Sequence, residues 1–208
     1  MVTGVAALAA VAAIGACSNS ATKEATSSTA ASTAQSSSAA PAVAHTQADM
    51  MFARMMIPHH QQAVQMSDMI LAKQGIDPRV IDLTKQIKAA QGPEIDQMQG
   101  WLTQWGMPAS PTTPPSGSMM PGMPGMDDMP GMQGMMSPAD MQALQNAQGV
   151  EASKLFLTQM IKHHQGAITM AQNEIKNGQF PDAVALAKSI ATSQQKEIDT
   201  MNQFLSSL

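Results

Sequence analysis

Two stretches of this chain repeat each other about a hundred residues apart, and each is centred on a pair of adjacent histidines. The first reads FARMMIPHHQQAVQM from Phe52, and the second reads FLTQMIKHHQGAITM from Phe156. Four of the five histidines in the chain belong to these two pairs, His59–His60 and His163–His164. Such a repeat constrains the fold more than composition does, because both copies are expected to form the same structural unit.

The duplication continues beyond the histidines. A second shared segment contains Gln-x-x-Glu-Ile-Asp-x-Met followed by an aromatic residue and Leu, and it includes Glu94 in the first copy and Glu197 in the second. The two copies are offset by 104 residues around the histidines and by 103 around the glutamates. Each copy therefore consists of a histidine segment followed by a glutamate segment.

The N-terminal region is predicted to lie outside the fold. Residues 5–13 form an apolar run that is too short to span a bilayer as a helix. Small residues follow and end at Cys17, the only cysteine, so residues 1–17 resemble a bacterial lipoprotein signal peptide with its lipobox, although no Lys or Arg precedes the apolar run. Residues 18–48 are rich in Ser, Thr and Ala and are predicted to be a disordered tether. The alternative is a buried apolar N-terminal strand with a free thiol.

The composition of the chain argues against one class of binding partner. A net charge of −4 and a pI near 5.6 argue against nucleic acid, because no basic face is available to neutralise phosphates. The unusual feature is methionine, with 21 residues in 208.

The remaining chain is predicted to be all-α, with one domain over residues 49–208 in halves 49–106 and 138–208. Hydrophobic periodicity and end signals predict long helices at about 49–73, 79–105, 151–177 and 182–206, and a short helix after Ser137. Asp49 and Asp182 are the expected caps of the first and last helices, and the Gly92–Pro93 pair predicts a kink or break. Two duplicated hairpins favour a four-helix bundle with residues 107–137 as an irregular crossover loop.

The histidines and glutamates are predicted to face the interior. At 100° per residue, His59 and His163 lie within the apolar faces of their helices, and His60 and His164 lie at the margins. The glutamates of the partner helices also fall on apolar faces, where a carboxylate is costly unless it is paired or binds a metal. We therefore expect the two halves to bring their imidazole and carboxyl groups to one interior region.

Simpler interpretations remain open for the same residues. A histidine on an apolar face is often a core residue with an ordinary hydrogen bond. Glu94 and Glu197 could pair with His59 and His163 across the bundle and form only a structural polar layer. Methionine at helical spacing usually fills the core rather than binding metal.

The crossover loop carries a second candidate site. Residues 119–136 contain eight methionines interspersed with Pro-Gly pairs, where no core needs filling. Thioether ligands favour Cu(I), and by analogy Ag(I), over hard cations. A low-complexity linker of drifted composition is the alternative interpretation. The candidate ligands in the loop are Met119, Met120, Met123, Met126, Met129, Met132, Met135 and Met136.

These motifs resemble the domain-of-unknown-function family numbered 305, over about residues 49–208. The resemblance implies a ferritin-like four-helix bundle, and for some members export and copper binding or tolerance. In this chain Gln159 stands where the first copy has Met55, and Phe204 stands where it has Trp101. The family pattern gives as metal ligands Met56, His59, His60, Met66, Glu94 and Met98 in the first half, and Met160, His163, His164, Met170, Glu197 and Met201 in the second.

Three functions follow as hypotheses. The favoured one is an exported protein, lipid-anchored at Cys17 to the outer face of the cytoplasmic membrane or the periplasmic side, which buffers Cu(I) or transfers it to a copper-accepting protein. It requires no catalytic residue. The second is a di-iron or di-manganese oxidase or peroxide-removing enzyme, although Met56 and Met160 stand where such bundles place the Glu of a Glu-x-x-His motif. The third is a structural lipoprotein in which the polar layer fixes helix register.

Overall fold

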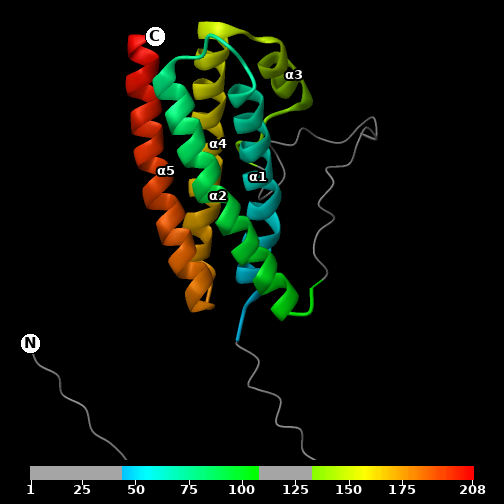
Figure 1. Cartoon of the computed structure of the whole chain (residues 1–208). Helices are drawn as coiled ribbons and strands as arrows, with labels where there is room; N and C mark the ends of the chain where they lie inside the picture. Colours follow the sequence, from blue (N-terminus) through cyan, green and yellow to red (C-terminus); the bar gives the residue numbers. More distant parts are fainter. Residues whose placement is uncertain (1–43, 108–132) are drawn as a thin grey trace, which may run out of the picture. The chain divides into compact units, whose positions relative to one another are not determined.

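The computed structural model describes residues 44–107 and 133–208, and within these ranges every regular element is a helix (Figure 1). The four long helices are α1 (Gln47–Leu71), α2 (Pro78–Gln104), α4 (Gly149–Asn177) and α5 (Pro181–Ser207), and a short α3 (Pro138–Asn146) precedes α4. The prediction of an all-α bundle of two hairpins is confirmed, with the long helices beginning and ending within two residues of the expected positions. In the described ranges, no helix is long and apolar enough to cross a membrane.

The residues that cap the first and last helices differ from the predicted ones. Thr46 caps α1, and Asp49 lies three residues later, where its carboxylate completes a capping box with Thr46. Asp49 also accepts hydrogen bonds from the backbone N–H groups of Gln179 (3.0 Å) and Phe180 (2.9 Å), so α1 caps the beginning of α5. Asp182 lies in the first turn of α5 without capping it.

The sequence predicted a kink or a break at Gly92–Pro93; the break is absent, because α2 continues through both residues. Pro93 removes one backbone donor from the helix, which leaves the carbonyl of Ala89 without its usual partner. Pro93 is exposed and Gly92 is partly exposed, so water can replace the lost bond. A proline on the solvent face therefore does not end this helix.

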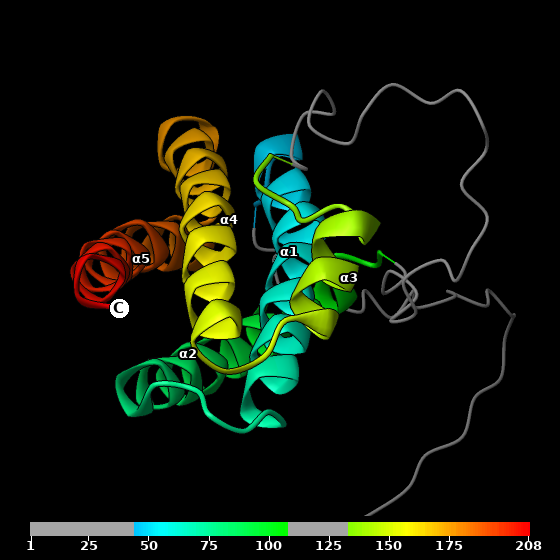
Figure 2. The same cartoon turned by 90° about the horizontal axis from the view of Figure 1, so that it is seen from above.

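The helices pack as two hairpins, α1–α2 and α4–α5, joined chiefly through α1 and α4 (Figure 2). Viewed from above, α1 and α4 lie next to each other, whereas α2 and α5 make few contacts. The segment that follows the crossover loop, residues 133–136, lies against α1 and α4, and we refer to it as the strap.

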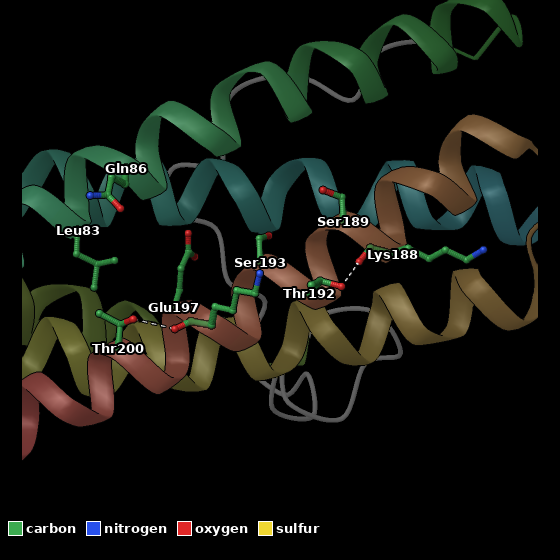
Figure 3. Close-up of a pocket in the computed structure, with 9 residues that line it drawn as sticks. Leu83, Gln86, Lys188, Ser189, Thr192, Ser193, Glu197 and Thr200 are labelled. Carbon is green, nitrogen blue, oxygen red and sulfur yellow. Dashed lines mark hydrogen bonds between the residues drawn. The ribbon is translucent and has the colours of Figure 1, made fainter.

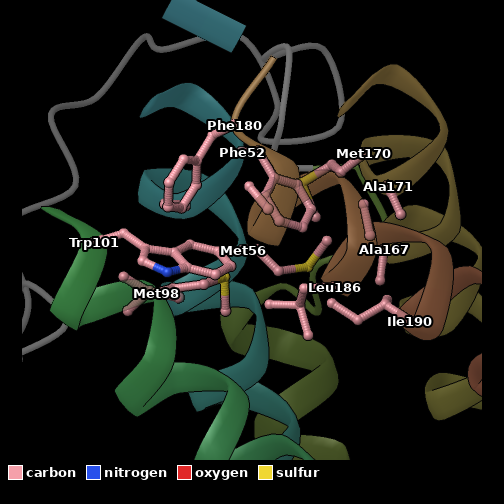
Figure 4. Close-up of a cluster of buried hydrophobic side chains, with 14 of the residues drawn as sticks. Phe52, Met56, Met98, Trp101, Ala167, Met170, Ala171, Phe180, Leu186 and Ile190 are labelled. Atoms are coloured by element: carbon pink, nitrogen blue, oxygen red, sulfur yellow. The ribbon is translucent and has the colours of Figure 1, made fainter. Parts of the chain in front are cut away.

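Two apolar clusters fill the bundle, and methionines from three helices contribute to each. The first cluster lies where α1 begins and α2 ends, and it includes Phe52, Met56, Met98, Trp101, Met170, Phe180 and Ile190 (Figure 4). The second lies toward the other end and includes Ala63, Met66, Ile87, Phe156, Met160 and Met201. Residues of one cluster correspond in the repeat to residues of the other, so the two clusters are related by the duplication.

Candidate metal centre

The four paired histidines form part of a polar layer between the two apolar clusters. On α1 the sequence passes from Met56 in the first cluster through His59 and His60 to Ala63 in the second. The other long helices make the same transition at mid-length. All four histidine side chains are almost fully buried, with relative exposures of 0–1%. The prediction that the duplicated segments bring their imidazoles to one interior region agrees with this arrangement.

His59 of α1 and His163 of α4 form the inner pair. Their ring centroids are 3.7 Å apart, and the ring planes are inclined by 39°. Burial away from water, reinforced by the neighbouring imidazoles, lowers the pKa of His59 to about 3 and the pKa of His163 well below its ordinary value. Both rings are therefore neutral near pH 7, which is the form that binds metal ions.

His60 and His164 form the outer pairs with the two glutamates. His60 Nε2 lies 2.7 Å from an oxygen of Glu94, and His164 Nε2 lies 2.6 Å from the equivalent oxygen of Glu197. The sequence-based alternative paired these glutamates with the inner histidines, and this pairing is wrong. Each glutamate reaches the histidine of its own hairpin, and that second histidine is as deeply buried as the first.

These contacts fix where the ring protons lie. A carboxylate or carbonyl oxygen only accepts, so Nε2 must carry the proton in His60, in His164 and in His59, whose Nε2 donates to the backbone carbonyl of Gln133 at 3.2 Å. The Nδ1 atoms of these three rings are buried without a hydrogen-bond partner, as are both ring nitrogens of His163. A histidine with one nitrogen tied to an acceptor and the other free has the arrangement of a metal ligand with its supporting partner.

Two glutamines complete the polar layer and were not among the predicted site residues. Gln91 and Gln194 lie one helical turn before Glu94 and Glu197, and both are buried. Both amide atoms of Gln91 and the oxygen of Gln194 lack hydrogen-bond partners in the structure. The repeated Gln-x-x-Glu spacing was the sequence signal for them, because it places both polar side chains on the inward side of one helix.

One side of the layer communicates with solvent. A groove of about 670 Å³ lies between α2 and α5, bordered by Leu83 and Gln86 on one side and by hydroxyl, lysine and glutamate side chains of α5 on the other (Figure 3). Glu197 lines this groove and is 20% exposed, whereas His164 behind it is completely buried. The carboxylates therefore lie between the solvent and the outer histidines.

Comparison with known proteins identifies the family. The domain of unknown function DUF305 matches residues 49–205. The chain belongs to the DUF305 family. No protein with a curated description matches it.

Solved DUF305 structures share this fold. A protein of the family from Streptomyces coelicolor, described as secreted, is 33% identical, with a TM-score of 0.66, 77% of this chain covered and 93% of the other. A fragment from Deinococcus radiodurans is 29% identical, with a TM-score of 0.65 and coverages of 78% and 98%. CopM in its Cu(I)-bound form is 31% identical, with a TM-score of 0.59 and coverages of 76% and 96%, and Cu(II)- and Ag-bound forms of CopM also match.

The predicted thioether ligands of this DUF305 chain fall into three groups. The six methionines predicted from the repeat are buried in the two apolar clusters next to the polar layer. The first cluster contains Met56, Met98 and Met170, and the second contains Met66, Met160 and Met201. Of the loop methionines, Met136 is buried in the second cluster and Met135 is partly buried. Met119, Met120, Met123, Met126, Met129 and Met132 lie outside the described residues, as does Cys17.

The donor set suits a soft ion better than a hard one. Among the described residues, no three or more His, Cys, Asp or Glu side chains are grouped to hold a metal ion. Cu(I) needs fewer ligands and accepts neutral imidazole together with thioether sulfur, both of which border this layer.

Proposed function

We propose that this protein binds Cu(I), with Ag(I) as a chemical analogue, in the polar layer of the bundle. The observation that carries the proposal is the set of buried ring nitrogens without partners, above all those of His59 and His163. Leaving such atoms unpaired costs about 1–3 kcal/mol each, a cost that a bound metal ion removes. The copper- and silver-bound structures of CopM, a relative with the same fold, support the choice of metal.

The roles within the site follow from the contacts. The inner imidazoles of His59 and His163 provide the neutral nitrogen ligands, and Nδ1 of His60 or His164 would join them only if the side chains move on binding, since the four histidines are not grouped as a ready-made ligand set. Glu94 and Glu197 act as acceptors that orient the outer rings and increase their basicity, rather than as direct ligands. Thioethers bordering the layer, Met56 and Met160 first, complete a soft coordination sphere.

In the cell, we propose that the protein is exported and anchored through a lipid at Cys17, with residues 18–48 as the tether. The Met-rich residues 119–136 collect Cu(I), and the bundle holds it for buffering, tolerance or transfer to a copper-accepting protein. Binding and release need no chemical conversion of a substrate, so the protein is a metal carrier rather than an enzyme.

The test is competitive titration of the purified protein with Cu(I) against a chelator of known affinity. Replacing His59 and His163 together by Ala should weaken binding in the bundle at least a hundredfold, and deleting residues 119–132 should remove further, weaker sites. His45→Ala is the matched control, because His45 stacks on Trp105 (ring centroids 4.6 Å apart) and is not one of the four histidines of the layer. Unchanged stoichiometry and affinity after both changes would refute the proposal.

Methionine ligation is tested separately. The double variant Met56→Leu with Met160→Leu preserves side-chain volume and should cost less than about 1.5 kcal/mol of stability per site. If the sulfurs bind Cu(I), its affinity for the metal falls although the fold is retained. Equal affinity would assign these methionines to the core alone.

The two alternatives give different results in the same protein. A di-iron or di-manganese enzyme predicts about two of these ions per chain after isolation, with His and carboxylate ligands. A purely structural lipoprotein predicts no metal affinity tighter than micromolar, with the polar layer serving helix register.

A further inference from the structure

The Met136 end of the strap is held by two hydrogen bonds with one side chain of α1, Gln62. The amide of Gln62 donates to the backbone carbonyl of Met136 at 2.9 Å and accepts from its N–H at 2.7 Å. The Met136 side chain is buried in the second apolar cluster. The end of the crossover loop is thereby held at a defined place on the surface of the bundle.

Two glycines let the strap touch the backbone of α4. Gly134 has a positive φ of 80°, and a Cβ on it would lie 2.6 Å from the carbonyl oxygen of Lys162. A Cβ on Gly166 would overlap the carbonyl group of Gln133, with its carbon only 2.6 Å away. Both clashes are with backbone atoms, so no side-chain rotation can relieve them. A larger residue at position 166 therefore displaces the strap.

The strap ends on an inner histidine. The carbonyl oxygen of Gln133, pressed against Gly166, accepts the hydrogen bond from His59 Nε2 at 3.2 Å. The strap makes no such contact with His163, whose ring lies against the backbone of His59 instead. The inner pair is therefore unequal, although the sequences around the two histidines are nearly the same.

We propose that the Gly134–Gly166 contact is a positioning device for the metal centre. By holding the Gln133 carbonyl on His59, it selects the tautomer with the proton on Nε2 and leaves Nδ1 as the lone pair that binds Cu(I). This inference rests on the function proposed above and identifies how the site is controlled. It makes strap docking and metal binding mutually dependent, because coupling between two binding events is reciprocal.

The experiment uses the full chain with Gly166→Ala, and Gly100→Ala as the matched control, since a Cβ at Gly100 meets nothing within 4 Å. In the metal-free protein, ring ¹⁵N chemical shifts should show His59 with its proton on Nε2 in the wild type and in Gly100→Ala. In Gly166→Ala, the two tautomers should mix. This measurement needs no metal, and a merely structural role for the strap would leave the tautomer unchanged.

The metal-bound measurements test the coupling. Gly166→Ala should weaken Cu(I) binding about ten- to a hundredfold, the usual effect of losing the partner of a ligating histidine. In the wild type, Cu(I) should slow hydrogen exchange at the Met136 N–H, which reports on strap docking through Gln62, by a similar factor. Gly100→Ala should change neither quantity.

Three outcomes would overturn the inference: a wild-type His59 protonated on Nδ1, an affinity in Gly166→Ala equal to that of the control, or a Met136 exchange rate indifferent to Cu(I). If Gly166→Ala does not fold, Gln62→Ala releases the strap without adding volume and carries the same expectations. If the wild type binds no Cu(I), the proposed function fails, and the tautomer measurement still decides whether the strap positions His59.

Discussion

The two halves of the bundle are nearly the same where they face each other and differ where the connecting segment lies on them. Both contribute an inner histidine, an outer histidine hydrogen-bonded to a glutamate, and a buried glutamine. Two of their differences are Gln62 against Gly166 and Met55 against Gln159. Gln62 binds the strap, Gly166 makes room for it, and Gln159 donates to the backbone carbonyl of Asp140 at the beginning of α3.

This pattern separates two requirements on a duplicated sequence. The core and the polar layer are related by symmetry, so both copies need the same residues there. The connection between the copies exists only once, and its docking surface cannot be symmetric. The departures at Gln62/Gly166 and Met55/Gln159 therefore mark the docking surface, and the strap carries the asymmetry to His59 through Gln133.

The largest expected effect tests whether the two apolar clusters are equivalent. Met56→Ala and Met160→Ala should each lower the free energy of unfolding by about 2–5 kcal/mol, because both side chains are fully buried and each change leaves a cavity. Urea unfolding of the metal-free protein measures both. Met51→Ala, on a side chain that is 46% exposed, should cost almost nothing. A large loss in one half only would show that the clusters are not energetically equivalent.

The second prediction concerns a position where the copies differ in charge. Glu174 corresponds to Ile70 of the first half, and it is buried beside Asp49. Burial, together with the hydrogen bond and negative charge of Asp49, raises the pKa of Glu174 to about 8. Burial alone would also raise the pKa of Asp49, but hydrogen bonds from Thr46, Glu174 and backbone N–H groups lower it to about 2. Near pH 6 a protonated Glu174 therefore lies beside an ionised Asp49.

The sign of the pH dependence follows from Glu174. The folded protein keeps this proton up to about pH 8, whereas the unfolded chain releases it near its ordinary value of 4.5, so stability falls as pH rises between these values. Glu174→Gln keeps a neutral side chain of similar size and removes the titration. Its stability relative to the wild type should rise by on the order of 2–4 kcal/mol from pH 5 to pH 8.5. Parallel stability curves for the two proteins would contradict this assignment.

The sequence predicted the repeated parts of the molecule best. Helix positions and the burial of His59 and His163 follow from local periodicity, which is a property of each helix alone. Prediction from the sequence failed where the position of a side chain depends on contacts between helices. His60 appeared marginal because the apolar face of α1 was counted without α2, which covers it with Glu94.

The same limit applies to caps and to the connection. Asp49 was expected to be the cap of its own helix, but Thr46 takes that position, and the Asp49 carboxylate serves both the capping box of α1 and the beginning of α5, more than 130 residues later in the chain. Neither the strap nor its contact with His59 could be predicted, since a backbone carbonyl leaves no mark in a side-chain pattern. The single signal was Gly166 in place of Gln62, a glycine inside an otherwise conventional helix.

A smaller effect is expected from the outer pairs, and it tests their equivalence in metal binding. Glu94→Gln and Glu197→Gln should each weaken Cu(I) binding about ten- to a hundredfold, since an amide polarises the histidine less than a carboxylate does. Asp96→Asn, on an exposed residue of α2, is the control. Similar losses would place the ion centrally between the halves. A loss confined to one variant would assign the ion to that hairpin.

The smallest expected effect comes from restoring the repeat at Gln159. Gln159→Met gives the second half the residue of the first and removes the hydrogen bond of 2.9 Å from its amide to the Asp140 carbonyl. The net loss of stability should be only about 0.5–1.5 kcal/mol. The decisive measurement is hydrogen exchange, which should accelerate in α3 and remain unchanged in α5. The reverse change, Met55→Gln, should leave exchange in α3 unaltered, because the carbonyl acceptor of Asp140 is bound by Gln159 of the second half. If both changes loosen α3 equally, the departures from the repeat would not mark the docking surface of the connection.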